Sequence, residues 1–203
     1  MYSHCLKRVL DFLLALCGLL VLWPLFLVIA IAIKADDPGP VFFSQKRVGL
    51  HKRYFQLYKF RSMKVCTPDV PTHLLEHPEQ YISRVGGFLR KYSLDELPQI
   101  INILLGQMAV IGPRPALWSQ EDLIAERDKY GANDVRPGLT GWAQINGRDE
   151  LTIEEKSAYD GEYVRNLSFA FDCKCFFDTI GAVLRHDGVV EGAQKSDRTV
   201  VHK

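Results

Sequence analysis

The chain has almost no excess of charge of either sign. Its 203 residues include 25 Lys and Arg against 24 Asp and Glu, which leaves a net charge of +1. A strongly basic chain would favour nucleic acid as a partner, and a chain with high charge and few apolar residues would favour disorder. We therefore expect no nucleic-acid partner, and the length suits one compact domain with a short appendage.

Cysteine is scarce, and its spacing is not that of a disulfide framework or a zinc site. The five cysteines include no C-x-x-C pair, and the nearest two are Cys173 and Cys175. The six histidines also lack the spacing of metal ligands. These patterns predict reduced thiols in a catalytic domain that faces the cytoplasm, and they leave the role of Cys173 and Cys175 open.

Common nucleotide-binding and hydrolase motifs are missing as well. The sequence contains neither a P-loop nor a G-x-G-x-x-G fingerprint placed between a strand and a helix, and no Ser/His/Asp triad is legible. Any nucleotide site in this chain must therefore be built in another way.

What the chain does contain is one long apolar run near its start. Residues 10–33, LDFLLALCGLLVLWPLFLVIAIAI, carry a single charge, and a helix that rises about 1.5 Å per residue would reach across a bilayer over this length. The run is longer than the apolar part of a cleavable signal peptide and lacks an A-x-A-like end. It predicts a membrane segment over residues 1–35.

Pro24, which follows Trp23, lies in the middle of this run. Proline removes a backbone donor and crowds the preceding turn, so a kink is expected there. Basic residues flank both ends, Lys7 and Arg8 before the run and Lys34 after it, and the positive-inside rule then favours neither orientation of a straight span. A kinked transmembrane helix and a re-entrant helix broken at Pro24 are equally compatible with these residues.

The rest of the chain predicts an α+β, mainly helical fold with a small β-hairpin. Residues 36–187 are expected to form a cytoplasmic catalytic domain, and residues 188–203 a polar tail. Two aromatic and basic runs at 41–49 and 52–63 indicate the hairpin, and the proline-rich residues 65–81 indicate a loop. Helices are expected at 119–130, 152–166 and 169–186.

The last of these helices has an amphipathic pattern. Its apolar residues recur at three- and four-residue spacing and are Phe169, Cys173, Phe176, Phe177, Ile180 and Val183. Such a face either packs on the domain, which is the interpretation we favour from the pattern, or lies on a membrane surface.

Asp95 and Glu96 are adjacent carboxylates at the start of a stretch with helical apolar spacing. The helix is expected to begin near Ser93, or to start or bend at Pro98. Neighbouring residues do not share a helix face, so the two carboxylates could cooperate only near the helix end. Ser93 to Glu96 also matches a capping box. These residues alone favour the catalytic and the structural interpretation equally.

Cations supply a second signal. Several Lys and Arg residues lie in extended or turn-prone segments, where they could converge on a diphosphate, and the guanidinium group suits bidentate phosphate contacts. The segments 111–115 (IGPRP) and 136–148 (RPGLTGWAQINGR) are expected to be rigid loops that carry some of them. The predicted phosphate-binding set is Lys59, Arg61, Arg90, Arg114, Arg136 and Arg148.

Several motifs occur together in a distinctive order. They are KR at 7–8, YKFRSM at 58–63, SLDELPQ at 93–99, IGPRP at 111–115 and DVRPGLTGWAQINGR at 134–148. In this order they resemble the bacterial sugar transferases, specifically the small monotopic phosphoglycosyl transferases, over about residues 1–187. The resemblance is strongest to those members that begin the lipid-linked glycan of bacterial N-glycosylation.

The resemblance implies a two-step reaction at the inner membrane, on its cytoplasmic side. Asp95 would attack the sugar-bearing phosphate of a UDP-sugar, expel UMP and form a sugar-phosphoryl aspartate, which polyprenyl (undecaprenyl) phosphate would then attack. Glu96 would assist by positioning or by acid/base chemistry, and Mg²⁺ would bind with Asp95 as its protein ligand.

The resemblance also implies a re-entrant helix broken at a Ser-Pro pair, where this chain has Trp23-Pro24. It further implies an N-acetylated amino sugar as the transferred group, and other glycan-assembly enzymes as possible partners. Two alternatives are a catalytically silent membrane scaffold and a sugar-nucleotide hydrolase.

Overall fold

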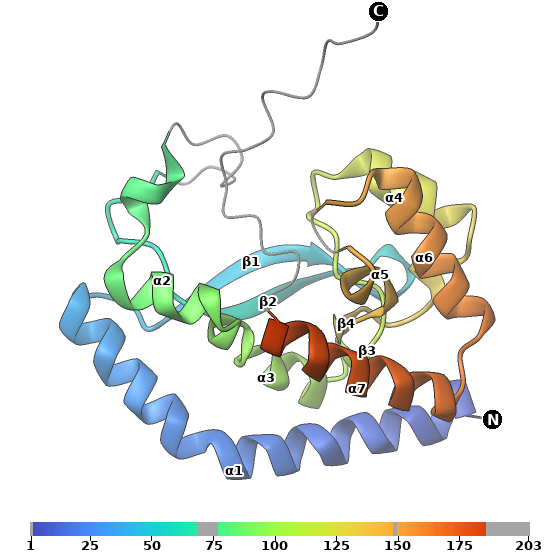
Figure 1. Ribbon diagram of the computed structural model, residues 1–203, viewed down its shortest axis with the longest axis horizontal. Helices are drawn as coiled ribbons and strands as arrows, with labels where there is room; N and C mark the ends of the chain where they lie inside the picture. Colours follow the sequence, from blue (N-terminus) through green and yellow to red (C-terminus); the bar gives the residue numbers. More distant parts are fainter. Residues whose placement is uncertain (1, 69–76, 148–149, 186–203) are drawn as a thin grey trace, which may run out of the picture.

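The computed structural model of the chain describes residues 2–68, 77–147 and 150–185. The fold is α+β and mainly helical, as the sequence predicts. Figure 1 shows a long N-terminal helix along one side of a compact body that holds the short strands and the other helices. The predicted polar tail at 188–203 lies outside the described residues.

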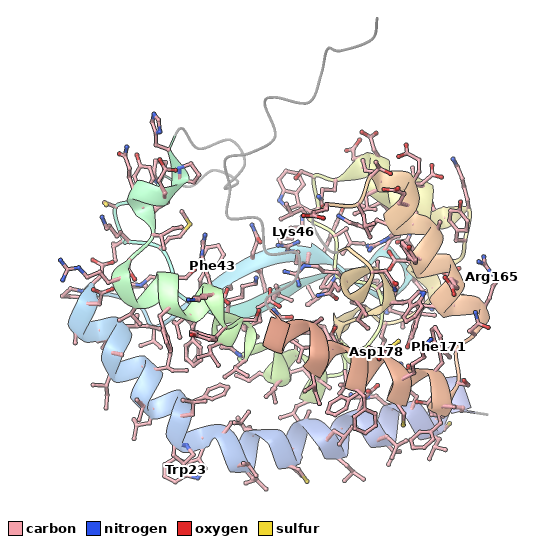
Figure 2. The ribbon with its side chains drawn as sticks, viewed as in Figure 1. Trp23, Phe43, Lys46, Arg165, Phe171 and Asp178 are labelled. Atoms are coloured by element: carbon pink, nitrogen blue, oxygen red, sulfur yellow. The ribbon has the colours of Figure 1, made fainter. Side chains whose placement is uncertain are left out.

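Helix α1, Lys7–Asp36, follows a π-helical turn, η1, Tyr2–Leu6. The helix continues through Pro24, and Figure 1 shows that it bends midway, around the body of the protein. The predicted kink is confirmed, and the expected break is corrected, because the helix bends without interruption. Figure 2 places Trp23 on the outer side of the bend, pointing away from the domain.

The two ends of α1 are attached to the same domain. Near its start, the Nζ of Lys7 lies 2.6 Å from the Oδ2 of Asp172, and both residues are buried. At its end, the carboxylate of Asp36 accepts a hydrogen bond of 2.9 Å from the backbone N–H of Val85. By length and composition α1 could cross a membrane, yet both of its ends are held by one folded unit.

Strands β1, Phe42–Val48, and β2, Tyr54–Phe60, form the predicted antiparallel hairpin around a short 3-10 turn, η2, Leu50–Lys52. Phe43 lies opposite Lys59, and Arg47 lies opposite Phe55. Because side chains alternate between the two faces of a strand, these four residues share one face. Phe55 and Leu57 on that face are buried in the core, so Lys59 and Arg47 lie at opposite ends of an apolar centre.

Helix α3, Gln99–Leu104, packs on that face and buries Ile100 and Ile103 against it. The fully buried Asn102 fixes its register. The side-chain amide of Asn102 donates to the carbonyl of Gln56 at 2.7 Å, and its oxygen accepts from the backbone N–H of Tyr58 at 3.0 Å. These bonds satisfy polar groups that would be costly to bury unpaired, and they place the start of α3 beside β2.

Between the hairpin and α3 lie η4, Pro78–Tyr81, α2, Arg84–Lys91, and a 3-10 turn, η5, Leu94–Glu96. Ser83 caps α2, because its hydroxyl accepts from the N–H of Gly86 at 2.9 Å. A Cβ on Gly86 would lie 1.9 Å from the carbonyl oxygen of Ser62. Only glycine allows α2 to approach the backbone that follows β2 this closely.

The remaining elements complete the body of the domain. Strands β3, Ala109–Ile111, and β4, Gly138–Thr140, pair in parallel, and helices α4, α5, α6 and α7 follow in chain order with a 3-10 turn, η6, Ala132–Asp134, before β4. The helices span Glu121–Asp128, Trp142–Ile145, Ile153–Arg165 and Phe169–Arg185.

Three of these helices confirm the predicted ones at 119–130, 152–166 and 169–186. The segments expected to be loops at 111–115 and 136–148 prove to include the ends of a parallel strand pair and a short helix. Three-residue strands are too short to show a period of two, and so the sequence pattern did not indicate them.

The apolar stripe of α7 is mostly exposed, which corrects the favoured prediction that it packs on the domain. Phe169, Phe176 and Phe177 are 56%, 42% and 68% exposed, whereas Asp172 and Cys175 are buried. The helix is oriented by the polar contacts of Asp172, which bonds to both Lys7 and the hydroxyl of Tyr163. This anchor turns the most apolar face outward.

Candidate active site

The predicted capping box at Ser93 does not form. Ser93 has a left-handed backbone conformation with φ of 54°, and its side chain caps no N–H group. The α-helix begins only at Gln99, with Pro98 at the N-cap, where a missing N–H costs nothing. Asp95 and Glu96 therefore lie in the turn η5, ahead of α3, and the side chain of Glu96 does not cap a helix.

Both oxygens of Glu96 bind cations. Its Oε1 accepts from the Nζ of Lys59 at 2.8 Å and from Nη2 of Arg114 at 2.6 Å, while Oε2 accepts from Nη1 of Arg114 at 3.2 Å. Burial by itself would raise the pKa of Glu96, but the charges and hydrogen bonds of Arg114 and Lys59 outweigh it and hold this pKa well below its usual range. Glu96 is therefore ionised and fixes both cations.

Asp95 is equally buried but much less engaged. Its Oδ2 lies 4.0 Å from the Nζ of Lys59, and among the described residues no donor forms a hydrogen bond to its carboxylate. Burial raises the pKa of Asp95, against the lowering effect of Lys59, and the charge of Glu96 raises it further. A carboxylate close to cations but without hydrogen bonds has oxygens free to attack an electrophile.

Two arginines from other elements, Arg127 of α4 and Arg47 of β1, hold the loop after β3 that carries Arg114. Nη1 of Arg127 donates to the carbonyl of Arg114 at 2.9 Å, and Arg127 pairs with the buried Asp160 at 2.6 Å. Nη1 of Arg47 donates to the carbonyl of Pro115 at 3.0 Å. The sequence analysis missed Arg47, Arg127 and Asp160, because their partners lie far away along the chain, and only the basic run around Arg47 hinted at a role.

The predicted phosphate-binding cations are not all brought together. Arg90 donates to the hydroxyl of Ser62 at 2.9 Å and lies close enough to Asp95 to lower its pKa against the larger effect of burial. Arg61 instead pairs with Asp37 at 3.0 Å, at the end of α1. Arg136 donates to a backbone carbonyl at Gly106, at 3.1 Å, and Arg148 lies outside the described residues.

The carboxylate most suited to Mg²⁺ is Asp95. Mg²⁺ in phosphate-transfer sites is commonly bound by one or two carboxylates, with water and substrate phosphates completing its shell. Both oxygens of Glu96 are taken by Lys59 and Arg114, whereas Asp95 has only the 4.0 Å ion pair with Lys59 among the residues that the structure describes. Among the described residues no group of three or more His, Cys, Asp or Glu side chains could hold a metal alone, so the substrate would have to supply ligands.

This geometry can now be compared with known proteins. A family model described as bacterial sugar transferase matches residues 2–186. The chain belongs to this family. Its carboxylate pair and the basic loop at Arg114 are therefore features of a bacterial sugar transferase.

Similar bacterial sugar transferases differ in length and in the sugar they are named for. The UDP-glucose:undecaprenyl-phosphate glucose-1-phosphate transferase of Escherichia coli (strain K12) is 40% identical over 191 residues, which cover 88% of this chain and 40% of that protein. The uncharacterized sugar transferase EpsL of Bacillus subtilis (strain 168) is 39% identical over 184 residues, covering 91% and 90%.

A third relative is named for an amino sugar. The UDP-N-acetylgalactosamine-undecaprenyl-phosphate N-acetylgalactosaminephosphotransferase of Aeromonas hydrophila is 36% identical over 187 residues, which cover 88% of this chain and 44% of that protein. The chain thus spans about two fifths of the length of the Escherichia coli and Aeromonas hydrophila relatives, and nearly all of the length of EpsL.

Proposed function

We propose that this chain transfers a sugar 1-phosphate from a UDP-sugar to polyprenyl phosphate, with undecaprenyl phosphate as the expected acceptor, and releases UMP. The observation that carries the proposal is the division of roles between two adjacent carboxylates. Glu96 binds Lys59 and Arg114, and Asp95 lies beside them without a hydrogen bond from any residue in the described part of the chain. The names of the relatives support the same overall reaction.

The reaction would proceed by two displacements at one phosphorus atom. In the first, an Asp95 oxygen forms a bond to the sugar-bearing phosphorus, and the bond from that phosphorus to the oxygen bridging to UMP breaks. In the second, a phosphate oxygen of the lipid attacks the same phosphorus and releases the Asp95 carboxylate. Covalent catalysis divides a difficult transfer into two easier ones.

Lys59 and Arg114 would stabilise the charge on the transferring phosphate. They are held in place before substrate arrives, because Glu96 binds both and each comes from a rigid element, β2 or the loop after β3. Mg²⁺, bound by Asp95 and by substrate oxygens, would further offset charge on the diphosphate. Glu96 would then act as the positioning residue of the pair.

For the membrane, we propose a re-entrant α1 at the bacterial inner membrane, with the domain on the cytoplasmic side. Lys7 and Asp36, near opposite ends of α1, both bond to the domain, and a straight span would place those ends on opposite sides of the bilayer. The outer side of the helix offers apolar side chains to lipid, among them Leu14, Leu20, Val21, Val28 and Ile31, which are 55% to 74% exposed. The exposed Phe177 of α7 suits the same interface.

For the donor, an N-acetylated amino sugar is the first candidate, as the family resemblance implies. The relatives named for glucose and for N-acetylgalactosamine widen the set to be tested. Other glycan-assembly enzymes would be partners that accept the lipid-linked product.

The decisive test is UMP release from a panel of UDP-sugars, measured on protein in nanodiscs with Mg²⁺ and undecaprenyl phosphate. We expect release with at least one donor, its loss in Asp95→Asn, and no labelled covalent intermediate in that variant. Asp122→Asn, at an exposed position on α4, is the matched control and should behave as wild type.

The alternatives give different results in the same assay. A silent scaffold would release no UMP from any donor. A hydrolase would turn over at the same rate without lipid acceptor. Full turnover by Asp95→Asn would show that the covalent mechanism is wrong.

A further inference from the structure

Arg47 is a largely buried guanidinium group without a carboxylate partner among the described residues. Its Nη1 donates to the carbonyl of Pro115 at 3.0 Å, and its Nη2 donates to the Oε1 of Gln45 at 2.7 Å. Its Nε is buried and has no hydrogen-bond partner. Burial and the neighbouring charge of Arg114 together lower the pKa of Arg47 to about 10, against the raising effect of Glu96. Both hydrogen-bond partners are neutral, and Glu96, whose negative charge raises the pKa of Arg47, already binds Lys59 and Arg114.

Arg127 is a structural arginine that contacts the same loop, and it can be compared with Arg47. It also donates to a loop carbonyl, that of Arg114, but its charge is matched by Asp160, which is only 1% exposed. The contact of Arg47 with the loop therefore uses one of its N–H groups but does not neutralise its charge. A buried cation that lacks a counter-charge is costly unless an anion completes it.

The position of Arg47 indicates which anion. Arg47 interacts electrostatically with Arg114 and Glu96, while Asp95 interacts with Lys59, Glu96, Arg90 and Arg114. Arg47 bonds to the carbonyl of Pro115, the residue after Arg114. The side chain of Arg114 in turn binds Glu96, the neighbour of Asp95. A diphosphate with one phosphorus at Asp95 would extend toward Arg47 with its other phosphate.

We infer that Arg47, together with Arg114, binds the nucleotide-side phosphate of the donor, the group that leaves as UMP. This inference rests on the proposed function. The contacts above use one N–H of Nη1 and one N–H of Nη2, which leaves the second N–H of each nitrogen for phosphate oxygens. Arg47 acts on binding and departure of the nucleotide, not on the attack by the lipid.

The test compares UMP with uridine, which has the same base and ribose but no phosphate. Binding is measured by calorimetry on the full chain in nanodiscs, with weak uridine binding followed by displacement. Arg47→Gln should weaken UMP binding about ten- to a hundredfold, the range expected for a lost charge-assisted hydrogen bond, and leave uridine binding unchanged. Arg47→Lys, which keeps the charge, should recover part of the loss.

Arg165→Gln is the matched control, because Arg165 lies in the last turn of α6 and is exposed, on the far side of the body in Figure 2. It should bind UMP as wild type does. Unchanged UMP affinity in Arg47→Gln would overturn the inference. An equal loss of UMP and uridine affinity, accompanied by a lower melting temperature, would also overturn it, because it would show that Arg47 only holds the Pro115 loop.

The inference and the proposed function can fail separately. If wild-type protein binds UMP through Arg47 but releases none from any UDP-sugar, the transferase proposal fails and the phosphate site stands. If wild type turns over and Arg47→Gln binds UMP normally, the phosphate site fails and the transferase proposal stands.

Discussion

Replacing Glu96 by Gln tests whether this residue holds the cations of the site. The substitution keeps the volume of the side chain and removes the charge that binds Lys59 and Arg114 at 2.8 and 2.6 Å. Neutralising one partner of a buried ion pair costs about 3–5 kcal/mol, because the remaining charge is left uncompensated. We expect the free energy of unfolding to fall by an amount of this order.

The rate of the first half-reaction should fall as well. The Nζ of Lys59 lies only 4.0 Å from the Oδ2 of Asp95, so once Glu96 is neutral a small movement brings it into hydrogen-bond contact with Asp95. A charge-assisted hydrogen bond to the nucleophile, worth about 1.5–3 kcal/mol, would have to be broken before attack. Because about 1.4 kcal/mol corresponds to a tenfold change in rate, UMP release should slow by about ten- to a hundredfold.

The assay is single-turnover UMP release with a labelled UDP-sugar, together with urea unfolding of the same protein. Glu79→Gln is the matched control, because Glu79 pairs with His77 at 3.2 Å on the surface, where an ion pair contributes at most about 1 kcal/mol. A Glu96→Gln protein that releases UMP at the wild-type rate would refute the reasoning.

Three further results are expected. Gly86→Ala should unfold at a lower urea concentration, because its Cβ would lie 1.9 Å from the carbonyl oxygen of Ser62. Gly87→Ala is the control: the nearest atom to its Cβ is 3.8 Å away, so its free energy of unfolding should stay the same or rise by about 0.5–1 kcal/mol. Equal effects of the two substitutions would contradict the packing argument. Removing divalent cations with EDTA should abolish UMP release, and Mg²⁺ should restore it; turnover that survives chelation would exclude the proposed metal. In sealed vesicles an impermeant maleimide should label Cys5 and Cys66, both exposed, from one side, whereas labelling from opposite sides would exclude a re-entrant α1. Buried Cys175, whose pKa is raised by burial to about 12, should stay protonated and unlabelled at neutral pH.

Some of this protein could be predicted from local patterns. The apolar run predicts α1, Pro24 predicts its bend, and the two aromatic and basic runs at 41–49 and 52–63 predict the hairpin. Thr152 likewise predicts the start of α6, where it forms a capping box with Glu155. These features depend on residues a few positions apart, which is the range over which periodicity and capping act.

The same kind of pattern gave a wrong prediction where a distant contact prevailed. Ser93 and Glu96 have the spacing of a capping box, but Glu96 instead binds Lys59 and Arg114, 37 and 18 residues away. The stripe of α7 has the spacing of a core helix, but the buried pair between Lys7 and Asp172 turns it outward.

The sequence by itself determined which charged groups the site could use, and its ordered motifs determined the family. Only the tertiary structure decided which of them meet. Lys59, Arg90 and Arg114 gather at the carboxylates, Arg61 and Arg136 bind elsewhere, and Arg47 contacts the loop that carries Arg114, 68 residues away along the chain. The physical reason is that a buried charge is stabilised by the opposite charge that the fold brings within a few ångströms of it. The spacing of two residues along the sequence does not determine their distance in the folded chain.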